Sequence, residues 1–144
     1  MNVGFIGLGT AQGAGDGTSP AAMMEVCYAV ITCLPSPAAS AAVLDEMLPR
    51  MTAGKIWMEM STTDPQEVRR LAARVAGQGG HAVDCPVSGG CHRADTGNIS
   101  IYAGCDRATF ERVLPILTCM GRRILHVGDV GAASTLKVMP TYLA

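Results

Sequence analysis

Short apolar segments alternate along the chain with longer segments in which apolar residues recur at helical spacing. The short segments predict buried strands at residues 2–9, 28–35, 55–60, 81–87, 98–104 and 123–128. The longer segments begin at Ser-Pro, Asp-Pro or Asp, and they predict helices at residues 20–27, 36–49, 64–79 and 106–120. Strands and helices in alternation imply parallel pairing, with helices covering the sheet, which is the α/β class.

A glycine-rich stretch at residues 10–20 interrupts this alternation directly after the first predicted strand. Such loops often hold phosphate, because glycine lets backbone N–H groups approach an anion. The tripeptide Gly7-Leu8-Gly9 matches the start of the G-x-G-x-x-G dinucleotide fingerprint, but the sixth position is Gln12 and the third glycine arrives one residue late. No second strand with an acidic end follows. On the residues alone, a bare turn fits as well as a dinucleotide site.

The composition is that of an ordinary packed domain. The 144 residues are 49% hydrophobic and 16% charged, with a net charge of −1. These values favour one globular domain and leave no basic patch for nucleic acid. The apolar runs are shorter than the roughly 20 residues of a membrane helix, and the first residues lack the basic start of a secretion signal. We therefore expect a soluble, cytoplasmic protein that binds neither nucleic acid nor membranes.

The six cysteines are scattered along the chain without a C-x-x-C pair. This spacing disfavours a zinc ribbon or a thioredoxin-like site, so we expect no metal. Several of the cysteines lie in or beside apolar segments, where a reduced cysteine packs as a small hydrophobic residue. We expect them to be packing residues in a reducing compartment.

Five blocks of sequence together carry a family resemblance: "GFIGLG", "VITCLPSP", "MSTTDP", "DCPVSGG" and "GDVGAASTLKVM". In this order they resemble the β-hydroxyacid dehydrogenases, the family of 3-hydroxyisobutyrate dehydrogenase and tartronate semialdehyde reductase. The resemblance covers residues 1–9 and about 19–144. It implies a Rossmann-type dinucleotide-binding domain, a long linking helix and an all-helical second domain. It also implies hydride transfer between NAD or NADP and a small 3-hydroxy acid or its semialdehyde.

The resemblance assigns cofactor contacts to three of these blocks. They are Gly7, Leu8 and Gly9 under the pyrophosphate, Leu34 and Pro35 along the cofactor, and Ser61 and Thr62 near the nicotinamide ribose.

The same resemblance assigns the substrate side to two blocks. Ser88, Gly89 and Gly90 match the loop that binds the substrate carboxylate, where a hydroxyl and open backbone N–H groups suit an anion. Lys137 matches the catalytic lysine, whose ammonium can pass a proton to or from the hydroxyl oxygen. Without the family, the serine and glycines fit a tight turn, and the lysine fits an exposed helix position.

The chain departs from the family between Gly9 and Ser19. There the family has two further strands and their helices, about 35 to 45 residues by typical element lengths. Without strands 2 and 3, strand 1 becomes an edge beside strand 4, because the doubly wound order is 3-2-1-4-5-6. We expect the adenosine side of the cofactor site to be lost, with binding about a thousandfold weaker. The uncovered faces predict poor solubility or self-association.

A second departure lies near the end of the sequence. The family reads K-x-x-N-N, whereas Pro140 and Thr141 stand at the two asparagine positions. Proline disfavours helix there, and the threonine hydroxyl replaces a substrate-binding amide only in part. We expect a partial dinucleotide-binding domain at residues 1–136, the start of an interdomain helix at 137–144, and no helical second domain. Two functions stay open: the family's oxidoreductase, with Lys137 as the proton-transfer residue, or a truncated, non-catalytic remnant or interaction module.

Overall fold

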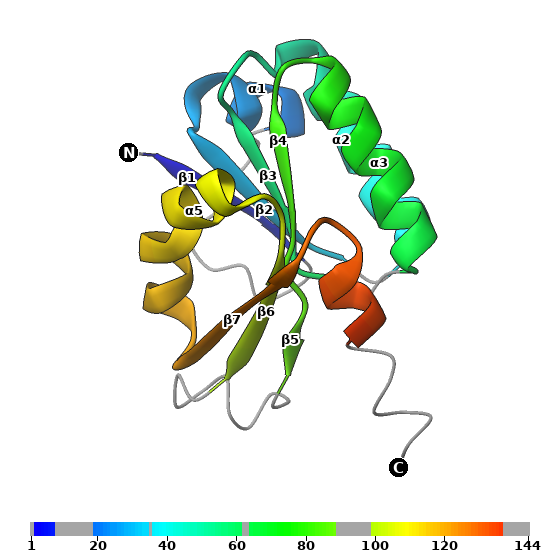
Figure 1. Cartoon of the computed structure of the whole chain (residues 1–144). Coiled ribbons are helices and arrows are strands. Elements are labelled where there is room, and N and C mark those ends of the chain that lie inside the picture. The colour runs from blue at the N-terminus through cyan, green and yellow to red at the C-terminus, as the bar shows by residue number, and fades with distance from the viewer. Residues whose placement is uncertain (1, 8–18, 35, 62–63, 89–98, 137–144) are drawn as a thin grey trace.

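The computed structural model of the chain describes residues 2–7, 19–34, 36–61, 64–88 and 99–136. In these ranges one sheet lies between α1, α2 and α3 on one face and α5 on the other (Figure 1). The strands are β1 Val3–Gly7, β2 Ala29–Cys33, β3 Ile56–Glu59, β4 His81–Asp84, β5 Val87–Ser88, β6 Ser100–Gly104 and β7 Arg123–Gly128. The helices are α1 Pro20–Val26, α2 Pro37–Met47, the 3-10 turn Leu48–Arg50, α3 Pro65–Gly77 and α5 Arg107–Met120. Residues 132–136 are also helical.

The four labelled α-helices begin at the capping residues that the sequence predicts. Ser19, Ser36, Asp64 and Asp106 each accept a hydrogen bond from a backbone N–H in the first turn, at 2.9 to 3.1 Å. Proline follows the cap in the first three helices, where it costs no hydrogen bond. Each helix start is therefore encoded within a few residues of the sequence.

Strands β1 to β4 are parallel, as the alternation with helices predicts. The prediction of parallel pairing throughout is wrong at β6, which runs antiparallel to both β4 and β5. Only residues 89–99 separate β5 from β6, and a parallel crossover needs a dozen or more residues. Parallel pairing returns between β6 and β7, which are joined through α5.

The single strand predicted at residues 81–87 is interrupted, and β5 continues the line of β4. Asp84 lies opposite Gly104, and Ser88 lies opposite Ser100. The step of four residues from Asp84 to Ser88 thus matches the step of four residues from Gly104 back to Ser100 on β6. Strands β4 and β5 therefore pair with the same edge of β6. The interruption falls at Pro86, which has no N–H to donate to a neighbouring strand.

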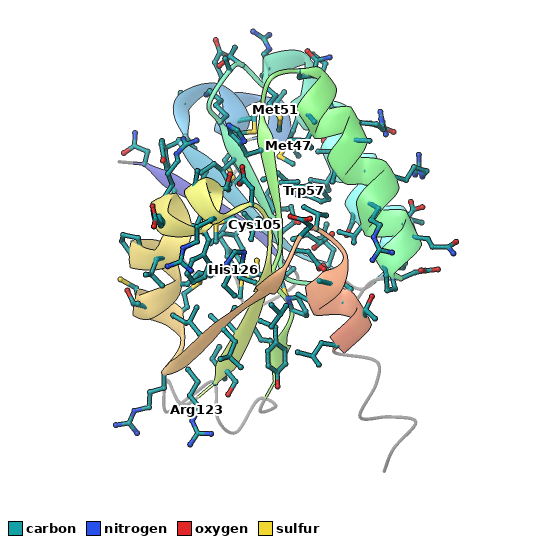
Figure 2. The ribbon with its side chains drawn as sticks, in the orientation of Figure 1. Met47, Met51, Trp57, Cys105, Arg123 and His126 are labelled. Atoms are coloured by element: carbon teal, nitrogen blue, oxygen red, sulfur yellow. The ribbon has the colours of Figure 1, made fainter. Side chains whose placement is uncertain are left out.

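Two hydrophobic layers fix the helices on the sheet. Trp57 is fully buried in the layer under α1, α2 and α3, together with residues such as Met47 and Leu71. Figure 2 shows Trp57 between the sheet and these helices. The other layer packs α5 on β2, β3 and β6 through residues such as Phe110 and Val113. Successive residues of a strand alternate between the layers, so each central strand is covered on both faces.

Strand β1 forms one edge of the described sheet, since β2 is its only strand partner among the residues described. This agrees with the predicted fold, in which strands 2 and 3 are missing and strand 1 lies beside strand 4. Val3 and Phe5 on β1 are 40% and 41% exposed. Val3 also lines an apolar groove of about 460 Å³ between this edge and the last turns of α5. Self-association through this edge stays a prediction.

In the parts of the chain that the structure describes, no helix has both the length and the apolar character needed to cross a membrane.

Candidate functional site

A row of three buried polar residues crosses the sheet where the parallel strands end. Thr32 on β2 lies opposite Glu59 on β3, and Glu59 lies opposite Asp84 on β4. All three are fully buried, on the face covered by α1, α2 and α3. Ligands of open α/β sheets bind just outside the carboxyl ends of the strands, so this row lies directly beneath the expected binding crevice.

Glu59 is the centre of a hydrogen-bonded chain that we call the Glu59 network, made of Trp57, Thr32, Glu59, Ser61 and Leu34. The Trp57 indole Nε1–H donates to Thr32 Oγ1 at 3.0 Å, and the Thr32 hydroxyl donates to Glu59 Oε1 at 3.1 Å. The backbone N–H of Ser61 donates to the same Oε1 at 3.0 Å. Glu59 Oε2 is buried and has no hydrogen-bond partner among the described residues.

The same network brings together predicted cofactor residues from different strands. The Leu34 backbone N–H donates to Ser61 Oγ at 2.7 Å, which joins the segment after β2 to the segment after β3. Gly7, the last residue of β1, lies opposite Cys33 in the sheet register and is therefore next to this pair. Leu8, Gly9, Pro35 and Thr62, the other predicted cofactor residues, lie outside the described residues. The carboxyl ends of β1, β2 and β3 therefore lie side by side here.

Cys33 is exposed at the end of β2, beside these strand ends, and the charge of Glu59 affects the pKa of its thiol. Partial burial raises the pKa of the Cys33 thiol, and the negative charge of Glu59 raises it further. At neutral pH the sulfur is therefore held as the thiol, which argues against a nucleophilic role.

Asp84 anchors the turn that precedes the helix at residues 132–136. Its Oδ2 accepts hydrogen bonds from the backbone N–H groups of Gly131 and Ser134, at 3.1 and 2.8 Å, and its Oδ1 accepts one from the Ser134 hydroxyl at 2.5 Å. Burial raises the pKa of Asp84, against the opposing effect of these hydrogen bonds and of the Arg69 charge. Gly131 has φ +96°, a conformation that favours glycine, and a Cβ there would overlap the Arg69 side chain.

The substrate side of the prediction is described only in part. Ser88 ends β5, four residues beyond Asp84 on the same line, which is about 13 Å along the strand direction. Gly89, Gly90, Lys137 and Thr141 lie outside the described residues. Lys137 directly follows the helix at residues 132–136 in the sequence. Ser134, which Asp84 holds, therefore lies about one helical turn before the predicted catalytic residue.

Sequence reasoning missed four residues of this region: Thr32, Glu59, Asp84 and Ser134. A signal for the first three was present in "ITC", "MEM" and "VDC", where one polar residue interrupts an apolar strand near its end. A buried polar residue in such a place needs a partner, which makes it a candidate for a structural or functional role. Ser134 gave no such signal, because its partner lies 50 residues away in the sequence.

The described cysteines are free thiols, and Cys27, Cys85 and Cys105 are buried. Burial raises the pKa of Cys85 well above its usual range and that of Cys105 to about 12. These thiols therefore pack as small apolar groups. Within the described ranges, no three His, Cys, Asp or Glu side chains come together as metal ligands would.

Comparisons with known proteins show the family to which the chain belongs. The family described as the NAD binding domain of 6-phosphogluconate dehydrogenase matches residues 9–128. Glyoxylate/succinic semialdehyde reductase 1 of Arabidopsis thaliana is 32% identical over 131 residues, which cover 89% of this chain and 45% of that protein. The 2-hydroxy-3-oxopropionate reductase of Escherichia coli K12 is 44% identical over 85 residues, covering 59% of this chain and 29% of that protein.

A solved structure, Mycobacterium tuberculosis 3-hydroxyisobutyrate dehydrogenase with L-serine, matches with a TM-score of 0.81 at 26% identity. The match covers 84% of this chain and 42% of that one. The chain therefore spans less than half the length of each of these three proteins.

Proposed function

Because this chain belongs to the family of the NAD-binding domain of 6-phosphogluconate dehydrogenase, we propose that it is the cofactor-binding part of an NAD(P)-dependent oxidoreductase. The reaction is the interconversion of a small 3-hydroxy acid and its semialdehyde by hydride transfer. The observation that carries the proposal is the meeting of Gly7, Leu34 and Ser61 at the carboxyl ends of β1, β2 and β3. The predictions of a Rossmann-like fold and of NAD or NADP as the cofactor agree with the family.

The residues at this place suit the nicotinamide half of a dinucleotide. Gly7 leaves the end of β1 without a side chain, while the Ser61 hydroxyl is held by the Leu34 N–H next to where the ribose would lie. When bound, the nicotinamide ring supplies the hydride acceptor or donor. In this proposal the backbone of residues 88–90 binds the substrate carboxylate, and Thr141 contacts the substrate.

Proton transfer is assigned to Lys137 in the same proposal. Its ammonium gives a proton to the carbonyl oxygen during reduction, and the free amine takes one from the hydroxyl during oxidation. Support comes from the block "GDVGAASTLKVM" and from the Asp84 anchor, which fixes the helical turn immediately before this residue.

A second candidate function is a non-catalytic module that retains only part of the cofactor site. The edge position of β1 favours it, since no described strand lies where the ribose-selecting strand of a dinucleotide fold would be. Pro140 and Thr141 at the two asparagine positions favour it too. Turnover separates the candidates: NAD-dependent oxidation of 3-hydroxyisobutyrate that disappears in Lys137→Ala supports the oxidoreductase.

The cofactor site itself is tested by titrating the purified chain with NADH and NADPH and following the nicotinamide fluorescence. We expect saturable but weak binding, with dissociation constants in the high micromolar to millimolar range. NADH and NADPH should bind with similar affinity. The residue that distinguishes them normally ends the second strand of the fold, which we expect this chain to lack. Reduced nicotinamide mononucleotide should retain most of the affinity, whereas AMP should bind far more weakly.

Absence of saturable binding for all three nicotinamide compounds would refute the proposed cofactor site. Tight micromolar binding of one dinucleotide but not the other would instead refute the loss of the adenosine side.

A further inference from the structure

We propose that Glu59 is a positioning residue for the nicotinamide half of the cofactor, and that its carboxylate favours the oxidised, positively charged ring over the reduced, neutral one. The proposal deepens the proposed function and rests on it. Glu59 is not among the residues that the family resemblance assigns to the site.

The positioning role follows from the Glu59 network. Glu59 Oε1 receives both the Thr32 hydroxyl from β2 and the Ser61 backbone N–H after β3. The Ser61 hydroxyl in turn accepts the Leu34 N–H. One carboxylate oxygen therefore sets the backbone of Ser61, and through it the separation of the two segments predicted to contact the cofactor.

The electrostatic role follows from the lack of a charged partner for Glu59 among the described residues. It is fully buried, it takes part in none of the ion pairs of the described residues, and its Oε2 has no hydrogen-bond partner among them. Burying a carboxylate in this way is costly, and an apolar residue of similar size would be cheaper for stability alone. Asp84, the neighbour in the same row, accepts three hydrogen bonds from one turn. The two acids are therefore not equivalent.

Glu59 is the last residue of β3 and is hydrogen-bonded to the backbone of Ser61, so a charge on Glu59 lies beside the predicted cofactor position. Burial raises the pKa of the Cys33 thiol at the exposed end of β2, and the negative charge of Glu59 raises it further. In a partly buried setting a negative charge stabilises a nearby positive charge. Oxidised nicotinamide carries a positive charge, whereas reduced nicotinamide does not, so the preference has a defined direction.

A purely structural role for Glu59 predicts something different. Loss of a structural hydrogen bond would lower stability and weaken both redox forms of the cofactor by the same factor. The ratio of the two dissociation constants is therefore the measurement that separates the two roles.

The test compares the wild-type chain with Glu59→Gln, Thr32→Val and the control Glu46→Gln, an exposed glutamate on α2. Dissociation constants for NAD⁺ and NADH are measured by NMR titration, below the unfolding temperature of every variant. In Glu59→Gln we expect binding of NAD⁺ to weaken about tenfold and that of NADH clearly less, so the ratio of the constants changes several-fold. In Thr32→Val both forms should weaken together, because the charge remains while the Ser61 support is disturbed.

Alkylation of Cys33 by iodoacetamide at mildly alkaline pH gives an independent measure of the charge. The rate should rise in Glu59→Gln, because removal of the negative charge lowers the pKa of the thiol, and should stay at the wild-type value in Glu46→Gln.

The outcomes separate the two levels of the proposal. No saturable binding of either form to the wild-type chain refutes the proposed function, and this inference with it. Wild-type binding with an unchanged ratio of constants in Glu59→Gln refutes only the role of Glu59. If Glu59→Gln does not fold, Thr32→Val decides, since wild-type affinity in that variant contradicts the positioning role.

Discussion

Replacing Trp57 with alanine should lower the free energy of unfolding by about 3 to 5 kcal/mol. Trp57 is fully buried between the sheet and α1, α2 and α3 (Figure 2), and removal of its ring leaves a cavity that the surrounding strands and helices cannot close. The substitution also removes the indole N–H that donates to Thr32. Urea unfolding followed by far-ultraviolet circular dichroism measures the effect without relying on tryptophan fluorescence.

Two further variants separate volume from hydrogen bonding at this position. Trp57→Phe keeps most of the apolar volume and should cost clearly less than the alanine change. Val26→Ala, at a residue that is 67% exposed, should change stability by about 0.5 kcal/mol or less. A loss below 1 kcal/mol in Trp57→Ala would contradict the placement of the ring in the core.

Asp84→Ala should cost about 3 kcal/mol or more, concentrated at the helix of residues 132–136. The change leaves the backbone N–H groups of Gly131 and Ser134 and the Ser134 hydroxyl without their buried acceptor, at about 1 to 3 kcal/mol for each unsatisfied group. Relative to the wild-type chain, hydrogen exchange should become faster at residues 131–136 and change less in α3. Ser134→Ala removes only the side-chain bond and should cost about 1 kcal/mol.

The cost of Asp84→Ala should also depend on pH, in a direction set by burial. Because burial raises the pKa of Asp84, the folded chain favours the neutral carboxyl. The part of its stabilising contribution that comes from the raised pKa is fully present below the pKa of an unfolded aspartate, about 3.9, and is lost as the pH rises through the higher folded value. The stability difference between wild type and variant should therefore shrink from acidic towards neutral pH. A difference that grows over this range would contradict the raised pKa.

The local features of the fold could be predicted from the sequence because their causes are local. Ser36 followed by proline caps α2, and the apolar run of β3 marks a buried strand. Both signals depend only on neighbouring residues in the sequence. The edge position of β1 could also be predicted, since the short connection to α1 leaves no room for two further strands. The antiparallel direction of β6 was missed because strand direction depends on the length of the connection and not on the strand sequence.

The supports of the site could not be predicted in the same way. The Glu59 network joins residues up to 27 positions apart, and the Asp84 anchor joins residues 50 positions apart. Such pairings follow from the register of the sheet, in which Thr32, Glu59 and Asp84 fall into one row. The family resemblance pointed to Leu34 and Ser61, while the structure adds the buried groups that hold them together.

The proposed cofactor site lies at the carboxyl ends of β1, β2 and β3, which we expect to bind the nicotinamide side of the cofactor. The most direct test is an NADH titration of the isotope-labelled chain, followed residue by residue through its backbone amide signals. We expect saturable shifts at Gly7, Cys33, Leu34 and Ser61, with little change at Gly54 and His81 near the opposite ends of the strands. Shifts confined to that opposite end, or no saturable shift at the four named residues, would contradict it.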